Sequence, residues 1–182
     1  MNVVPGSQQR TTDCGTDVIF VLDDSGSIGS TNFTLAKSFL SRLVAMLNIS
    51  SGRTRVGLVK YSTAVNARIY LSSYSSVSSL QAAISALTYT GGGTKTDMAL
   101  ADVRTRMLTS ATGDRSNAAN VVVVLTDGNS ASHNSTQVST PVLVYYGSNK
   151  HVCVFTAVKW NVMSGKLILL FMSSRQTSRT RC

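Results

Sequence analysis

The chain contains no glutamate, so all eight of its acidic residues are aspartates. Seventeen lysines and arginines oppose them, which leaves a formal net charge of +9. Glutamate is the usual acid of exposed helices, and without it few carboxylates are left that serve only as surface decoration. Four of the eight aspartates, Asp23, Asp24, Asp97 and Asp127, fall in segments that the motifs described below assign to one site.

Cysteines and long apolar runs are also scarce. The three cysteines lack the C-x-x-C spacing that would indicate zinc or a redox pair. One bridge and one free thiol are compatible with this odd number, and the pairing stays open. The longest late apolar run, Leu167 to Met172, is far too short to span a bilayer, so we expect no transmembrane segment. Residues 1–10 contain no apolar stretch that would act as a secretory signal.

The positive charge alone would suit nucleic acid, an anionic polysaccharide or an acidic protein. However, the arginines between positions 42 and 106 are scattered, with no basic run and no interleaved aromatic side chains on which bases could stack. We therefore expect no nucleic-acid partner and interpret the charge as a dispersed, solvated surface.

The pattern of apolar residues predicts alternating strands and helices. Strands are expected at 17–22, 54–61, 67–71, 120–126 and 151–158, and helices at 30–47, 77–87, 98–108 and 140–147. Ser30 or Thr31 would cap the first helix, and Thr140 with Pro141 would open the last. Such alternation predicts a single doubly wound α/β domain, in which a mostly parallel sheet has helices on both faces.

The first predicted strand ends in an acid followed by hydroxyls at alternate positions, Asp23, Ser25 and Ser27. In open α/β sheets, ligands bind outside the carboxyl ends of such strands. Turn chemistry alone would explain these residues, since Asp, Ser and Gly end strands in many proteins. The metal interpretation gains weight from two later segments.

One of these segments is the glycine-rich stretch that leads to Thr94, and the other is a second buried strand that ends at Asp127. Both would bring oxygen atoms to the edge of the sheet that carries Asp23. Hydroxyl and carboxylate oxygens suit a hard divalent ion, whereas zinc would favour Cys or His, which are missing from these motifs. The sequence therefore predicts a site for a hard divalent ion, Mg²⁺, Mn²⁺ or Ca²⁺.

Three motifs resemble those of the von Willebrand factor type A domain. They are D-x-S-x-S at 23–27, G-G-G-T-K-T at 91–96 and V-V-V-V-L-T-D-G at 121–128. The resemblance covers residues 14–158 and implies a Rossmann-like sheet with one antiparallel edge strand. It divides the chain into an N-terminal flank (1–13), the domain (14–158) and a divergent, partly disordered end (159–182), which holds five basic residues and no acid.

The resemblance also implies a metal-ion-dependent adhesion site, whose shell would be Asp23, Ser25, Ser27, Thr94 and Asp127. A Glu or Asp of a partner would supply the last ligand, and the domain would work in adhesion without catalysis. The Cys before the first strand is similar to that of extracellular members such as matrilins and non-fibrillar collagens. The expected partner is accordingly an extracellular protein, such as collagen or another matrix protein, and the expected location is extracellular.

Asp24 and Asp97 stand where many members of the family have a small residue, commonly Gly. Extra negative charge there would tighten metal binding and repel a partner's carboxylate. The bland interpretation, which we favour, is a solvated loop acid or an acid that the helix dipole stabilises. The alternative is that both act on the metal from outside its direct ligands.

Some further sites depend on an extracellular location. Asn32, Asn48 and Asn134 begin N-glycosylation triplets. Cys14 and Cys182 would join the two ends in a disulfide, as the resemblance to some extracellular members implies, and Cys153 would remain a small buried hydrophobe.

The favoured function is thus a cation-dependent module that holds a matrix protein. One alternative is a module that attaches to anionic or collagenous surfaces through basic faces, with a structural metal. The other is a metal-dependent hydrolase. That alternative is weak, because nothing orients His133 as a base for Ser25 and a phosphoryl-accepting aspartate usually needs a second acid where Ser25 stands.

Overall fold

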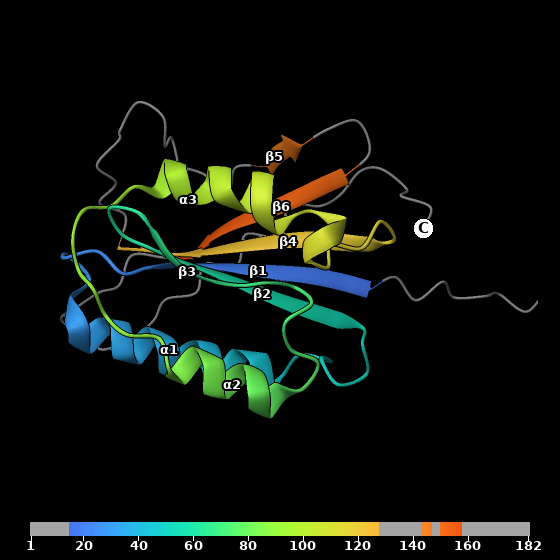
Figure 1. Cartoon of the computed structure of the whole chain (residues 1–182), viewed down its shortest axis with the longest axis horizontal. Coiled ribbons are helices and arrows are strands. Elements are labelled where there is room, and N and C mark those ends of the chain that lie inside the picture. The colour runs from blue at the N-terminus through green and yellow to red at the C-terminus, as the bar shows by residue number, and fades with distance from the viewer. Residues whose placement is uncertain (1–14, 128–142, 147–149, 158–182) are drawn as a thin grey trace, which may run out of the picture.

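The computed structural model describes residues 15–127, 143–146 and 150–157, which form one sheet between two layers of helices (Figure 1). The strands are β1 (Gly15–Asp23), β2 (Thr54–Tyr61), β3 (Val65–Ile69), β4 (Ala118–Leu125), β5 (Leu143–Tyr146) and β6 (Lys150–Ala157). The helices are α1 (Gly29–Ala45), α2 (Val77–Ser85) and α3 (Thr96–Asp102), with a π-helical turn η1 (Val103–Met107) and a 3-10 turn η2 (Ser110–Thr112).

The described residues contribute six strands to the sheet, in the order β3-β2-β1-β4-β6-β5. Strand β1 pairs in parallel with β2 and β4, and β4 pairs in parallel with β6. Strands β3 and β5 are antiparallel to their neighbours and form the two edges. The predicted doubly wound, mostly parallel class is confirmed, and the described residues hold two antiparallel edge strands where the family resemblance implied one.

Strand β1 is buried on both faces because its apolar run supplies a core on each side. Val18, Phe20 and Leu22 pack into the cluster under α1 and α2. Ile19 and Val21 pack on the opposite face with side chains of α3 and η1. Successive side chains of a strand point to opposite faces, so the continuous apolar run is what allows helices to cover both sides.

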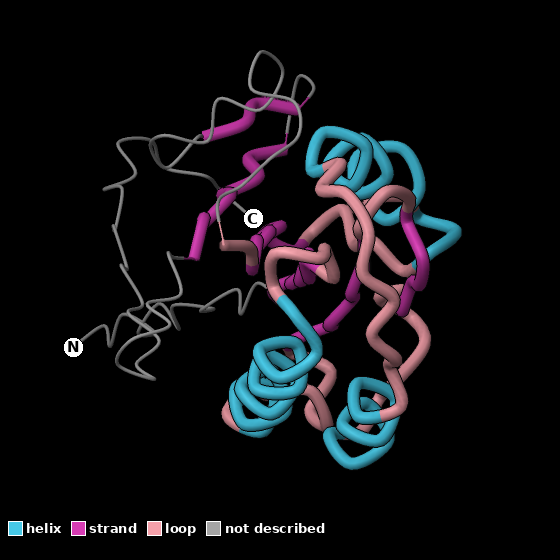
Figure 2. The backbone as a smooth tube through the Cα atoms, turned by 90° about the vertical axis from the view of Figure 1, so that its left-hand side faces the viewer, coloured by secondary structure: helices cyan, strands magenta, loops and turns pink. Residues whose placement is uncertain are grey.

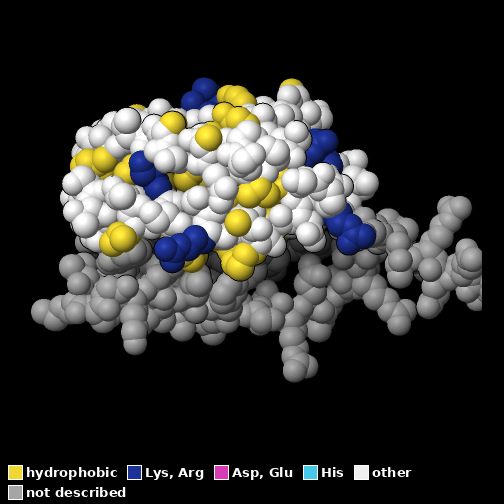
Figure 3. Space-filling model, turned by 90° about the horizontal axis from the view of Figure 1, so that it is seen from below, with side chains coloured by type: hydrophobic (Ala, Val, Ile, Leu, Met, Phe, Trp, Pro, Cys, Tyr) yellow, Lys and Arg dark blue, Asp and Glu magenta, His cyan; other side chains and the backbone are white. Residues whose placement is uncertain are grey.

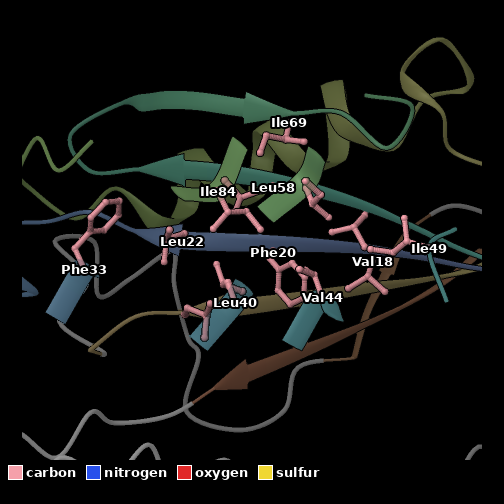
Figure 4. Packing of buried hydrophobic residues seen from close by; sticks show 13 residues of the cluster. Val18, Phe20, Leu22, Phe33, Leu40, Val44, Ile49, Leu58, Ile69 and Ile84 are labelled. Carbon is pink, nitrogen blue, oxygen red and sulfur yellow. The ribbon is translucent and has the colours of Figure 1, made fainter. Parts of the chain in front are cut away.

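Helices α1 and α2 lie side by side on one face of the sheet, and α3 lies on the other (Figure 1). Helix α1 buries Phe33, Leu40 and Val44 against β1. Figure 4 shows Phe33 near Leu22 at one end of this cluster and Val44 near Val18 towards the other. This layer therefore runs the length of β1, and Phe33 lies at the end where the strand finishes.

The predicted helices differ from those observed in four places, the smallest being the helix expected at 77–87, which ends at Ser85. Helix α1 begins at Gly29 after Ile28, without a side-chain cap, so neither Ser30 nor Thr31 caps it. The helix expected at 98–108 is α3, beginning at Thr96, followed by the π-helical turn. The helix expected at 140–147 is wrong over residues 143–146, which form β5, because the run Leu-Val-Tyr-Tyr favours a strand and pairs with β6.

A buried aspartate anchors the beginning of β1. Asp17 is fully buried and accepts hydrogen bonds from the Arg115 guanidinium at 2.7 and 2.9 Å and from its backbone N–H at 2.8 Å. Arg115 also donates to the carbonyls of Thr16, Gly52 and Arg53. This arginine thus ties the amino ends of β1 and β2 to the segment before β4.

No helix in the described residues is long and apolar enough to cross a membrane.

Replacing Leu40 by Ala is expected to lower the free energy of unfolding by about 2–5 kcal/mol, because the side chain is fully buried between α1 and the sheet. Leu35 is the matched control, since it lies on the same helix and is 46% exposed. The Leu35→Ala change should cost less than about 0.5 kcal/mol. Urea denaturation of both variants measures the difference, and equal losses would contradict the packing described here.

Candidate functional site

The candidate site lies where β1, β2 and β4 finish, at the end of the sheet that faces the viewer in Figure 2. Asp23 is the last residue of β1 and pairs in register with Tyr61, the last residue of β2. Leu22 pairs with Leu125 at the end of β4. Thr126 and Asp127 therefore leave β4 beside Asp23, and polar residues of two parallel strands meet at one edge.

Asp23 is almost fully buried, and both of its carboxylate oxygens accept hydrogen bonds. The backbone N–H of Ser25 donates to Oδ1 at 2.8 Å, and the Thr126 hydroxyl donates to Oδ2 at 2.6 Å. Burial raises the pKa of Asp23 above its usual value, and the negative charge of Asp127 raises it further. The carboxylate of Asp127 is thus close enough to disfavour the charged form of Asp23.

The hydroxyls of Ser25 and Ser27 lie together in the turn after β1, with their oxygens 3.1 Å apart. Ser25 is buried and Ser27 is exposed, so this pair extends from the interior to the surface. The turn is closed by a hydrogen bond from Ile28 N–H to the Ser25 carbonyl at 3.2 Å. Two oxygen donors are therefore held at adjacent positions next to Asp23.

Thr94 is 7% exposed and belongs to the glycine-rich loop, residues 88–94. Two backbone hydrogen bonds flank it, from Gly26 N–H to the Gly92 carbonyl and from Lys95 N–H to the Ser62 carbonyl, each 2.8 Å long. The loop thus crosses from the turn after β1 to the end of β2. Gly92 has a φ of 105°, and a Cβ there would lie 2.7 Å from the Thr63 hydroxyl, so only glycine fits.

Asp24 is not the solvated loop acid that the sequence suggested, because it is completely buried. Lys60 Nζ donates to its Oδ2 at 2.7 Å. The backbone N–H of Thr90 contacts both oxygens at 3.0 and 3.2 Å, and the Thr90 hydroxyl also donates to Oδ2. Asp24 is paired with a buried ammonium and binds the loop through Thr90, so the structure gives it a role in holding the loop.

Asp97 lies in the first turn of α3, as the helix-start interpretation expected. It is half-buried, and its Oδ1 has no hydrogen-bond partner in the described part of the structure. A buried oxygen without a donor is a candidate for water or for a cation-bound water.

The sequence reasoning missed Lys60, Thr90 and Thr126, all of which bind a carboxylate of the site. It also missed Tyr61, whose hydroxyl lies 3.0 Å from the Thr96 hydroxyl. Burial and the nearby charge of Asp23 raise the pKa of Tyr61 far above its usual value, so it stays a neutral phenol. The sequence did hold one signal for Lys60, because a lysine within a strand predicted to be buried needs an acidic partner nearby.

The oxygen donors of the site fit a hard divalent cation. Asp23 and Asp127 repel each other, and a cation bound between them would relieve the repulsion. The remaining donors are hydroxyls, and no cluster of three or more Cys, His, Asp or Glu side chains able to hold a metal occurs within the described residues. A cation here would therefore depend on hydroxyl oxygens, which suit Mg²⁺ better than softer metals.

Of the predicted glycosylation and disulfide sites, only some lie in the described residues. Asn32 lies in α1, where its side-chain amide donates to the Ile28 carbonyl at 2.9 Å, and Asn48 is exposed after that helix. Asn134, Cys14 and Cys182 lie outside the described residues, so glycosylation and the disulfide stay predictions.

Several known proteins are similar to parts of this chain. The human collagen α-1(XX) chain is 39% identical over 63% of this chain and 9% of its own length. Mouse matrilin-2 is 34% identical over 65% of this chain and 13% of its own, and bovine cochlin is 33% identical over 68% and 22%. The chain therefore spans less than a quarter of these curated relatives.

Two solved structures of proximal thread matrix protein 1 from the mussel byssus are also similar. One has a TM-score of 0.60 and 25% identity, covering 65% of this chain and 32% of that one. The other, with a zinc-occupied MIDAS motif, has a TM-score of 0.63 and 21% identity, covering 79% and 38%, and it shows likeness of fold alone. A family model described as the von Willebrand factor type A domain matches residues 17–168. Since that match covers most of the chain and agrees with the fold, the chain belongs to the von Willebrand factor type A family.

Proposed function

We propose that this domain binds one divalent cation through Asp23, Ser25, Ser27, Thr94 and Asp127. The main support for this proposal is that two carboxylates and a pair of adjacent hydroxyls lie together at the ends of β1 and β4. The loop that contains Thr94 is hydrogen-bonded to the same turn. Mg²⁺ matches this donor set best, and Mn²⁺ or Ca²⁺ are alternatives. The MIDAS motif of the mussel protein, which holds zinc there, supports a divalent ion at such a site.

The bound cation would hold a carboxylate of a partner protein. Ser27 is exposed, so the proposed site reaches the surface, and Lys95 next to Thr94 is an exposed cation. Asp24 does not repel an incoming carboxylate as the sequence suggested, because it is buried and paired with Lys60 at 2.7 Å. With Asp24 paired with Lys60, the bound cation and Lys95 would attract an acidic group of the partner.

We infer that the partner is an extracellular matrix protein and that the domain works by binding without catalysis. The similarity to collagen, matrilin and cochlin chains supports the location and the type of partner. Binding without catalysis is supported by Ser25, whose described hydroxyl partner is another serine hydroxyl rather than a base. His133 lies outside the described residues.

A second candidate function is attachment to a polyanion through basic side chains on the protein surface. The metal would then serve only to stabilise the domain. Every aspartate among the described residues is buried or half-buried. In the part of the chain whose burial is described, the exposed charged side chains are all basic, namely Arg42, Arg53, Lys95, Arg104 and Arg106. Figure 3 shows Lys and Arg side chains, and no Asp or Glu, on the described part of the face formed by α1 and α2. Such a surface would attract sulfated polysaccharides.

Calorimetric titration of the metal-free, 182-residue chain with Mg²⁺ and Mn²⁺ should detect one site. The Thr94→Ala and Asp127→Ala variants should each bind more than about tenfold more weakly, because each loses an oxygen donor. The control is Thr105→Ala, since the Thr105 hydroxyl is exposed and bonds only within its own helical segment. Absence of metal uptake by the wild-type chain would refute the proposal.

The Asp23→Asn variant should be more stable than the wild-type chain in EDTA at neutral pH, by about 0.5–2 kcal/mol. The raised pKa means that the folded state holds the Asp23 proton more tightly than the unfolded chain. Ionised Asp23 therefore destabilises the fold above that pKa, and the cost shrinks as the pH falls through it. Urea denaturation at neutral and acidic pH should show the gain decreasing on acidification. A less stable Asn variant at neutral pH would contradict this assignment.

The two candidate functions respond differently to chelation and to salt. Cation-dependent binding to immobilised collagen should disappear in EDTA and in Asp127→Ala. Binding to heparin-Sepharose should survive both and weaken steeply as salt rises, because surface charges are screened. Collagen binding that persists in EDTA, together with salt-sensitive heparin binding, would favour the second function over the first.

A further inference from the structure

We propose that Asp24, Lys60 and Thr90 form a buried clasp that holds the glycine-rich loop in register with the turn of Ser25 and Ser27. Asp24 and Lys60 would thus be positioning residues for Thr94, although neither touches the cation. The part of this inference that concerns metal affinity rests on the proposed function, whereas the positioning of the loop does not.

The clasp connects three segments that are far apart in the sequence. Asp24 follows β1, Lys60 lies in β2, and Thr90 lies in the loop after α2. Lys60 Nζ donates to Asp24 Oδ2 and to the Thr88 carbonyl, each at 2.7 Å. Since Thr90 donates to Asp24 from both its backbone and its hydroxyl, the loop is bonded to both members of the ion pair.

The clasp acts next to the predicted metal ligands. Two residues beyond Asp24, the Gly26 N–H donates to the Gly92 carbonyl at 2.8 Å, and the Tyr89 hydroxyl donates to the Ser25 carbonyl at 3.2 Å. A Cβ on Gly26 would lie only 3.3 Å from that Gly92 carbonyl. The loop and the turn are therefore in close backbone contact where Ser25 and Thr94 must both be placed.

The ion pair is buried to a degree that simple stabilisation does not explain. Asp24 is fully buried and Lys60 is 3% exposed. Burying two charges costs several kcal/mol and is offset only when the remaining donors and acceptors are satisfied. Here they are, since Asp24 accepts bonds from two residues, and Lys60 also lies 5.8 Å from the centre of the Phe33 ring. Pairs of this kind are best attested as devices that set register.

A second ion pair in the same domain serves as a matched control. Arg68 donates to Asp102 through two bonds of 2.7 Å and ties the edge strand β3 to α3. Within the described residues, Asp102 also pairs with Arg106 at 3.6 Å, and these contacts lie away from the glycine-rich loop and the turn after β1. Removing this pair shows how far the loss of a partly buried ion pair alone changes amide exchange and metal affinity, because the clasp stays intact.

The test uses the 182-residue chain with both charges of one pair removed, as Asp24→Ala with Lys60→Met, and as Asp102→Ala with Arg68→Met. Removing both charges avoids leaving one of them buried without a partner. A third variant, Thr90→Ala, keeps the ion pair and removes only the hydroxyl bond. Amide hydrogen exchange followed by NMR reports on the Gly26 N–H in EDTA, with the Phe20 N–H in β1 as the reporter of global opening.

In the Asp24/Lys60 double variant, the Gly26 amide should exchange about tenfold faster relative to Phe20, and Mg²⁺ should bind about tenfold more weakly. Thr90→Ala should change both in the same direction by less, and the Arg68/Asp102 variant should leave both within about twofold. Unchanged exchange at Gly26 in the first double variant would overturn the clasp. If the wild-type chain takes up no metal, the proposed function fails, and the Gly26 exchange rate alone still decides the clasp.

Discussion

The alternation of side chains at the end of β1 sends two adjacent aspartates in opposite directions, and the candidate site depends on this divergence. Asp23 lies on the face of α3 with Tyr61 and next to Thr126, at the site proposed for the cation. Asp24 lies on the face of α1, where Lys60 and Phe33 surround it. Because a strand places successive residues on opposite faces, Asp23 lies beside Thr126 at the proposed cation site, while Asp24 pairs with Lys60 in the scaffold.

This division determines the local electrostatics. A second free carboxylate beside Asp23 would add to the repulsion that Asp127 already exerts. The pairing with Lys60 removes that charge without removing the hydrogen-bonding capacity of Asp24, which then binds Thr90. The same residue that looked like an obstacle to an acidic partner thus becomes a support for the loop of Thr94.

The sequence predicted the fold best where one local signal acted alone. The buried strand at 54–61 was predicted at its observed bounds, and the helix beginning at Val77 was predicted from its apolar spacing. Prediction failed where two signals competed. Thr140 and Pro141 suggested a helix through 147, yet residues 143–146 pair with β6, because sheet pairing overrides a capping signal. The ligand set named from the motifs remains a prediction, although its residues are brought to one end of the sheet.

The sequence by itself determined the class of the domain and the oxygen chemistry of the site, because apolar periodicity and the three motifs are properties of short segments. Only the tertiary structure decided the role of Asp24 and revealed Lys60 and Thr90 as its partners, which lie 36 and 66 residues away along the chain. The physical reason is burial. Whether an acid is solvated or enclosed with a cation depends on which strands and loops pack around it, and no local pattern encodes that packing.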